Sequence, residues 1–228
     1  MKILAFDTSS ASGSVALLDN GRLAAEVMAG DAGTHADWLM RTSDSILRSV
    51  SCKINEIDLF AMGIGPGSFT GIRVGISTVK GLAWALDRDV AGVSTLKSLA
   101  LNLRYSGSLV CPVLDARKGE LYASLFSFEG DKIETLLHES ALPPDELFKF
   151  INVEAGGRHT VFLGNGLKVC SEDVKSRVKE ASLAPEPLWH IRASNIALLA
   201  YEEYGQRTAP ASISPVYLRK SEAEIKTS

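Results

Sequence analysis

The sequence lacks the features that mark membrane and secreted proteins. In its 228 residues no apolar run approaches the ~20 residues that a helix needs to cross a bilayer. The opening MKILAFDTSS turns polar after a short apolar run, where a secretory signal has a longer apolar region and a cleavage site. These absences predict a cytoplasmic protein with no membrane partner, and they indicate that the opening run is a β-strand.

Cysteine and net charge are also scarce. The three cysteines, Cys52, Cys111 and Cys170, lie far apart and form no CxxC pair, which excludes a local zinc or dithiol motif. We expect them to be reduced thiols. The formal charge is -3, and the basic residues are scattered among acids, whereas avid binding to a phosphate backbone needs a concentrated basic surface. Binding of a nucleic acid would therefore depend on a partner protein.

What the sequence does contain is a weak internal repeat. In residues 2–29 an apolar run ends at Asp7, and two further apolar runs follow, joined by an Asn-Gly turn that is typical of a β-hairpin. Residues 109–138 repeat this plan, with Asp115 at the end of the first run. The repeat predicts a three-stranded meander at the start of each half of the chain.

Helical spacing of apolar residues follows each meander. In the first half it predicts helices over residues 35–50, 71–86 and 95–105, with buried strands at 57–64 and 90–93. The second half is less regular, with helices expected near residues 144–151, 167–180 and 194–204 and a strand at 160–163.

This order of elements predicts an α/β protein with the actin-like kinase (ASKHA) fold. Such a fold has two ribonuclease-H-like lobes, each a mixed β-sheet flanked by helices. We place the first lobe at residues 1–105 and the second lobe, with the tail, at residues 106–228. The fold by itself assigns no function.

A glycine-rich loop, GIGPGSFTGIRVG at residues 63–75, joins a predicted strand to a predicted helix. Gly65 and Gly67 permit backbone angles closed to other residues, and Ser68 or Thr70 can cap the helix. Amide groups and the helix dipole would then favour an anion or a nucleotide phosphate. The loop is neither a P-loop nor a good dinucleotide fingerprint, and a purely structural turn remains the alternative.

The string GPGSFTGIRVG, the opening ILAFDTSS, the LDARKGELY segment and the closing PVYLR together resemble the bacterial TsaB family, also called YeaZ. The likeness covers essentially the whole chain. It implies the actin-like kinase fold, kinship with the enzyme TsaD, and a part in forming threonylcarbamoyladenosine beside the anticodon of tRNAs that read codons beginning with A. It also implies a non-catalytic subunit that pairs with TsaD, is joined by the ATPase TsaE, meets tRNA only within that complex and forms a homodimer alone.

A search for a catalytic set supports a non-enzymatic role. TsaD relatives hold a metal through an HxxxH pair in the first helix, but here Leu39 stands four residues after His35. The other histidines, His138, His159 and His190, have no ligand at helical spacing, so we predict no metal site.

Nucleotide chemistry is the rival interpretation. Asp7 opens a small polar turn like those that hold phosphates and magnesium in actin-like ATPases, whereas the LDARKGE segment replaces the second phosphate turn with bulky charged residues. We therefore expect no required cofactor, while ATP or ADP at the TsaD interface remains open. The alternatives are an ATPase or phosphotransferase that uses Asp7 and the glycine-rich loop, or a metallopeptidase, for which the chain has neither GxSxG nor HExxH.

The two first-lobe helices, residues 35–50 and 71–86, are the predicted docking surface. Small residues let helices approach closely, and a central aromatic commonly anchors an interface. The resemblance implies that TsaB-like proteins join TsaD here in a four-helix contact. The alternative is that these side chains face their own sheet. The predicted contact residues are Trp38, Leu39, Thr42, Ile46, Gly75, Ile76, Val79 and Lys80.

Overall fold

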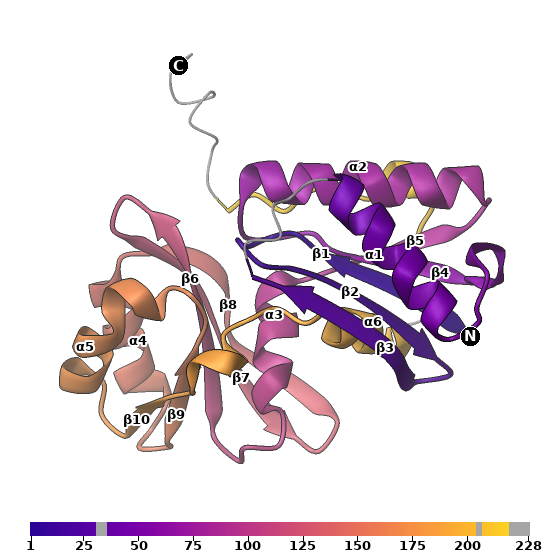
Figure 1. The fold of residues 1–228 in the computed structure, drawn as a ribbon. Helices are drawn as coiled ribbons and strands as arrows, with labels where there is room; N and C mark the ends of the chain where they lie inside the picture. Colours follow the sequence, from indigo (N-terminus) through magenta and orange to yellow (C-terminus); the bar gives the residue numbers. More distant parts are fainter. Residues whose placement is uncertain (31–35, 204–206, 219–228) are drawn as a thin grey trace. The chain divides into compact units, whose positions relative to one another are not determined.

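The computed structural model describes residues 1–30, 36–203 and 207–218 and divides the chain into two compact units (Figure 1). The first unit combines residues 1–98 with residues 191–216, and the second unit holds residues 99–190 together with the described residues 217–218. Each unit is built on one five-stranded mixed sheet.

The sheet of the first unit has the strand order β3-β2-β1-β4-β5. The meander β1–β2–β3 is antiparallel, and β4 and β5 continue it in parallel to β1. The elements of the unit are β1 (Lys2–Asp7), β2 (Gly13–Asp19), β3 (Arg22–Ala29), α1 (Ala36–Ser49), β4 (Leu59–Gly63), α2 (Phe69–Ala85), β5 (Asp89–Val93), the start of α3 (Thr95–Ala100) and α6 (Ala193–Glu202).

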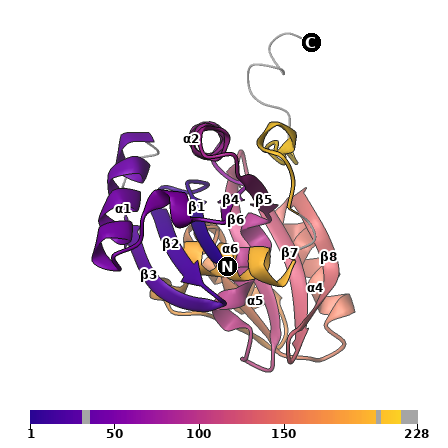
Figure 2. The same cartoon turned by 90° about the vertical axis from the view of Figure 1, so that its right-hand side faces the viewer.

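Helices cover both faces of this sheet. α1 and α2 lie side by side on one face, and α6 packs on β1, β2 and β4 from the other face (Figures 1 and 2). Every residue of β4 and all but the first of β1 are buried, as expected for central strands that are covered on both sides. Phe6, Leu39, Phe60 and Val79 belong to the core between the sheet and α1 and α2.

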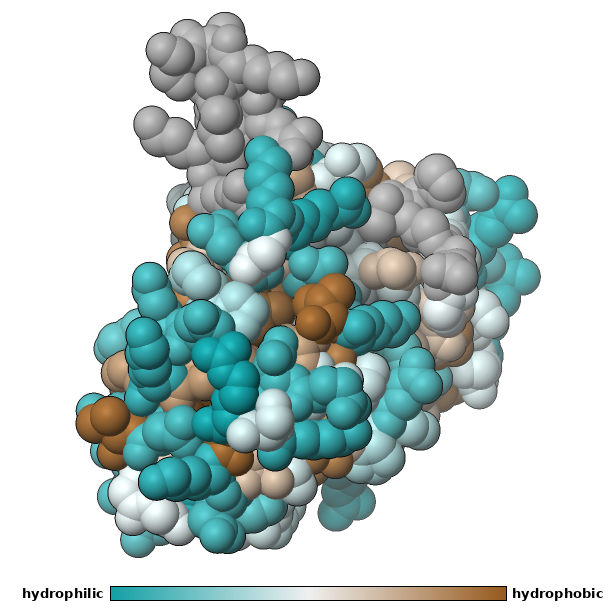
Figure 3. All heavy atoms as spheres, turned by 90° about the vertical axis from the view of Figure 1, so that its left-hand side faces the viewer, coloured by the Kyte–Doolittle hydropathy of each residue, from teal (hydrophilic) through white to brown (hydrophobic). Residues whose placement is uncertain are grey.

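The second unit repeats the plan with the strand order β10-β9-β6-β7-β8. Its meander β6–β7–β8 is antiparallel, β9 and β10 are parallel to β6, and α4 and α5 pack on the sheet and on one another. In the face seen in Figure 3, hydrophilic residues predominate and apolar residues occur in small groups. The elements are β6 (Leu109–Arg117), β7 (Glu120–Glu129), β8 (Lys132–Leu142), α4 (Pro144–Glu154), β9 (Thr160–Leu163), α5 (Leu167–Arg177) and β10 (Ala181–Leu183).

The predicted actin-like kinase fold and both predicted meanders are confirmed. The expected lobe boundaries, 1–105 and 106–228, differ from the structure because residues 191–216 return to the first unit. The physical reason is that the second face of the first sheet needs a cover, and the buried side of α6 supplies it. In the part of the chain that is described, no helix has both the length and the apolar character needed to span a membrane.

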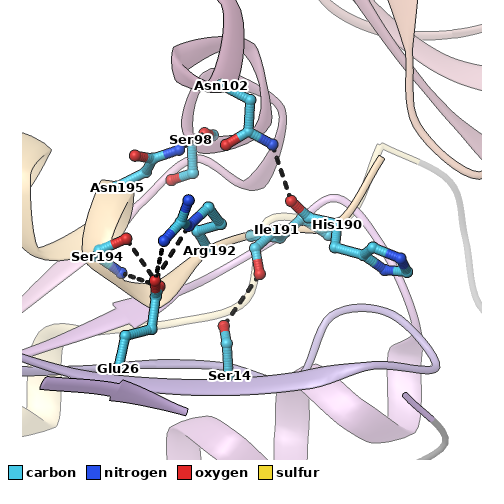
Figure 4. Close-up of polar contacts among 9 residues, drawn as sticks. All are labelled: Ser14, Glu26, Ser98, Asn102, His190, Ile191, Arg192, Ser194 and Asn195. Carbon is cyan, nitrogen blue, oxygen red and sulfur yellow. Dashed lines mark hydrogen bonds and ion pairs between the residues drawn. The ribbon is translucent and has the colours of Figure 1, made fainter. Parts of the chain in front are cut away.

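Polar contacts fasten α6 to the first unit (Figure 4). Glu26 of β3 accepts hydrogen bonds from the backbone nitrogen of Ser194 at 2.9 Å, from its Oγ at 2.7 Å and from Nε of Arg192 at 3.0 Å. Ser14 Oγ donates to the carbonyl of Ile191 at 3.0 Å. A carboxylate at the start of a helix satisfies free amide groups and complements the dipole, so these bonds fix where α6 begins.

Residues 207–216, here called the C-terminal strap, run along the edge of the same sheet. Thr208 and Val90 of β5 exchange two backbone hydrogen bonds, at 2.9 and 3.0 Å. Ile213 is buried in the core, and the Val216 nitrogen donates to the carbonyl of Ile64 at 2.8 Å. The strap therefore covers the edge of β5, which would otherwise present unpaired backbone groups.

Two glycines inside α2 differ sharply in their surroundings. A methyl group on Gly75 would collide with Met62 Cε and Thr8 Oγ1, whereas a methyl group on Gly81 would meet no atom of the described ranges within 4 Å. Gly75 is thus required where α2 presses on the sheet. Gly81 has no such internal reason, although a glycine in a helix costs about 1 kcal/mol relative to alanine.

We therefore predict opposite effects of the same substitution at these two positions. Gly75→Ala should lower the free energy of unfolding by about 1–3 kcal/mol because it overpacks the core. Gly81→Ala should raise it by up to about 1 kcal/mol through helix propensity. Urea denaturation of both variants measures the difference, and shifts of the same sign would contradict this account of α2.

Candidate functional site

The glycine-rich loop and the polar turn after β1 form one packed junction. The Ser68 nitrogen donates to the Ser9 carbonyl at 2.7 Å, and Thr8 Oγ1 donates to the Gly71 carbonyl at 2.7 Å. A Cβ atom at Gly67 would collide with the Ser9 carbonyl oxygen, so only glycine allows this approach. The glycine-rich loop and the polar turn that begins at Asp7 thus stabilise one another through these hydrogen bonds.

Amide groups of the loop are already used inside the unit. The Gly65 nitrogen donates to Thr95 Oγ1 at 3.2 Å, and the Gly71 nitrogen donates to Ser68 Oγ at 3.2 Å. The second bond confirms Ser68 as the cap of α2. Thr70 is exposed in the first turn. Because Gly65, Ser68 and Gly71 spend these donors on protein oxygens, the arrangement favours the structural alternative over an anion site at Gly65, Gly67, Ser68 and Thr70.

Asp7 is completely buried at the end of β1. Ser9 donates to its carboxylate from Oγ at 2.7 Å and from the backbone nitrogen at 3.2 Å. A Cβ atom at Gly63 would lie 2.5 Å from Asp7 Oδ1, so β4 approaches closely there. Burial raises the pKa of Asp7 from 3.8 to about 7, although the hydrogen bonds from Ser9 oppose this shift. The side chain fixes the polar turn.

The raised pKa predicts a pH dependence of stability. Between pH ~4 and pH ~7 the unfolded chain loses the Asp7 proton and the folded chain keeps it, so the free energy of unfolding should fall by about 1.4 kcal/mol per pH unit from this group. Asp7→Asn should remove that contribution, so the free energy of unfolding of the variant should increase relative to that of the wild type as pH rises.

Urea denaturation at several pH values measures this difference, with Asp37→Asn at an exposed position of α1 as the control. Parallel stability profiles for wild type and Asp7→Asn would contradict a shifted pKa in the folded state.

Asp115, the counterpart of Asp7 in the second unit, is exposed and organises a tight turn. Its Oδ1 accepts from the Arg117 nitrogen at 2.7 Å, and its own nitrogen donates to Asn165 Oδ1 at 3.0 Å. Arg117 and Lys118 both adopt positive φ, at 63° and 54°, which non-glycine residues rarely do. The LDARKGE segment therefore contacts the turn at Gly164–Gly166.

The predicted contact residues of the helix pair lie mostly in the core. The partly exposed members are Trp38, whose ring covers Gly13, and Lys80, whose Nζ donates to the Ala211 carbonyl at 3.4 Å. The apolar periodicity thus marked the face that packs on the sheet, as the alternative interpretation held. The buried members are Leu39, Thr42, Ile46, Gly75, Ile76 and Val79.

The sequence pattern did not identify the surface that this helix pair exposes. On α2 its members recur every three or four residues and carry little charge, which is the signal that could have identified them. They are Arg73, Ser77, Gly81, Trp84 and Ala85 on α2, and Met40, Arg41, Asp44 and Arg48 on α1.

The histidines that the structure describes form no shared metal site. In the described ranges, no group of three His, Cys, Asp or Glu side chains is arranged to hold a metal ion. His159 Nδ1 lies 3.1 Å from Ser108 Oγ, His138 is exposed, and His35 lies outside the described residues.

Comparison with known proteins identifies the family. Residues 31–227 match the family described as TsaD: tRNA N6-adenosine threonylcarbamoyltransferase. The chain is 28% identical over 227 residues to the tRNA threonylcarbamoyladenosine biosynthesis protein TsaB of Bacillus subtilis (strain 168), covering 99% of this chain and 97% of that protein. It is likewise 28% identical to the TsaB of Haemophilus influenzae (strain ATCC 51907 / DSM 11121 / KW20 / Rd), covering 96% of this chain and 94% of that protein.

A solved structure supports the same assignment. YeaZ from Pseudomonas aeruginosa superposes with a TM-score of 0.80 at 29% identity, covering 95% of this chain and 99% of that chain. The chain therefore belongs to the TsaD family and, within it, to the group named TsaB or YeaZ.

Proposed function

We propose that this chain is a non-catalytic subunit of the system that forms N6-threonylcarbamoyladenosine in tRNA, and that it pairs with TsaD through the exposed face of α1 and α2. The observation that carries the proposal is the exposed face of α2. This helix of 17 residues has no acidic residue, and Arg73 and Lys80 are its basic ones.

The exposed face of α2 has the properties of a helix-packing surface. Ser77, Gly81 and Ala85 follow one another at intervals of four residues and are all exposed. Small side chains at this spacing let a second helix approach closely. Among the described residues, none fills the space above Gly81, so a partner helix accounts for a glycine that is unfavourable in the isolated chain.

α1 supplies the rim of the same surface. Met40 is 44% exposed and adds an apolar contact. Arg41 pairs with Asp37 at 3.0 Å, and Arg48 pairs with Asp44 at 2.9 Å, both fully on the surface. An uncharged centre beside a charged rim is the common anatomy of protein interfaces. The same surface would serve a homodimer when TsaD is missing.

The hydrogen bonds of the polar motifs and the net charge of the chain support a scaffold role. Asp7 and the glycine-rich loop are engaged within the first unit, which favours a scaffold over an ATPase. TsaE and tRNA would be met as parts of the complex, since the net charge of -3 gives this chain little attraction for RNA of its own. Calorimetry of the isolated chain with MgATP separates the two roles, and tight binding would favour the ATPase.

The docking surface is tested by filling the space above Gly81. Gly81→Leu should weaken the complex with TsaD at least about tenfold, because a side chain as large as leucine separates two closely packed helices. The isolated variant should be no less stable than wild type, since leucine is a good helix former. The measurement is size-exclusion chromatography of each variant mixed with TsaD, calibrated by titration.

Lys168→Leu, at an exposed position of α5 in the second unit, is the matched control and should leave the complex unchanged. An unaltered complex with Gly81→Leu would exclude this face of α2, and two separate peaks for the wild type at micromolar concentration would exclude the pairing itself.

A further inference from the structure

A depression lies at the C-terminal end of α2, between that helix and the C-terminal strap. It has a volume of about 490 Å³, and we call it the α2 seat. Ala83 and Trp84 of α2 line it on one side, and Ala209, Pro210 and Ala211 of the strap line it on the other. All of its lining residues belong to the first unit, so its geometry is set by one folded body.

The most exposed part of the seat is the indole of Trp84. This side chain is 75% exposed, although tryptophan is on average one of the more buried residues in proteins. An exposed indole beside small apolar residues is a common anchor of protein interfaces. Its face also attracts cations, and most strongly a guanidinium group, which can stack on it.

The charges around the seat favour a cation. It is lined by two guanidinium groups and by three carboxylates, those of Asp58, Asp87 and Asp89. The C-terminal end of α2 adds partial negative charge. Arg88 directs Nε to the Ile57 carbonyl at 2.8 Å. Arg207 Nε lies 3.9 Å from Asp89.

Asp87 is the carboxylate available to a ligand. Within the described ranges, its side chain takes part in no hydrogen bond or ion pair. It stands two residues after Ala85, the last residue of α2, with φ at 53° and three residues beyond Trp84. A ligand in the seat can therefore meet both the indole and an unpaired carboxylate.

From the indole, the carboxylates and the strap, we infer that the α2 seat receives an arginine side chain of the partner protein. The inference rests on the proposed function only for which protein carries that arginine. An RNA base could also stack on Trp84, and a phosphate could pair with the arginines. The excess of carboxylates in the seat, however, repels phosphate. The seat thus adds a charge-selective contact at one end of the exposed face of α2, on which Arg73 is otherwise the charged residue.

The seat is tested on the isolated chain with a short arginine peptide, using a glutamate peptide of equal length and a single-stranded RNA as competing probes. The indole N–H signal of Trp84 in NMR spectra, identified by its loss in Trp84→Phe, reports binding. The arginine peptide should shift it saturably, and Asp87→Asn should weaken that binding about two- to fivefold. Asparagine tolerates positive φ, so this variant keeps the fold.

Glu154→Gln, at an exposed acid of α4 in the second unit, is the matched control and should bind the peptide like wild type. Equal binding by Asp87→Asn, or a response to RNA or to the glutamate peptide instead, would overturn the inference.

The link to the partner has a separate readout. The arginine peptide and Asp87→Asn should each weaken the complex with TsaD. A complex insensitive to both would show that no arginine of TsaD binds in the seat. Peptide binding without any complex would refute the pairing with TsaD and leave the seat for arginine standing.

Discussion

The contact on which the first unit depends is the close approach of backbone to backbone where the turn after β1 meets the loop before α2. The Ser68 nitrogen reaches the Ser9 carbonyl, and Thr8 reaches over to Gly71. A side chain at Gly67 would block this approach, so packing alone requires a glycine at this position of GPGSFTG. The junction sets the height and rotation of α2 on the sheet, and thereby decides which of its faces remains outside.

This rotation of α2 explains why the sequence pointed to the helix pair α1 and α2 but not to the residues that the pair exposes. Apolar side chains at helical spacing report burial, whatever buries them. Ile76 and Val79 therefore mark the sheet-facing side of α2, as Leu39 does on α1. The outer face of α2 carries serine, glycine and alanine, which give a hydropathy pattern almost no signal. Gly81 becomes informative only once the structure shows open space above it.

The fold itself was predictable in larger part, since the repeated meander and the Asp-tipped strands depend on local patterns. The role of α6 was not predictable in the same way. Its place on the first sheet is set by contacts between residues far apart in the chain, such as Glu26 with Ser194 and Ser14 with Ile191. A sequence read from end to end assigns residues 191–216 to the nearer lobe, and only the uncovered face of β1 and β4 requires otherwise.

Asp7 shows how the surroundings of an acidic side chain limit the chemistry that it can perform. A carboxylate that binds magnesium and phosphate must be ionised and reachable, yet this one is buried, bound by Ser9 and closed off by the backbone of Gly63. Burial raises its pKa to about 7, so part of the population is neutral under ordinary conditions. A neutral acid that tolerates burial costs the core little, whereas opening the site to a nucleotide would break the junction that orients α2. The two uses of Asp7 therefore exclude one another in this geometry, in which its carboxylate holds the turn that positions α2.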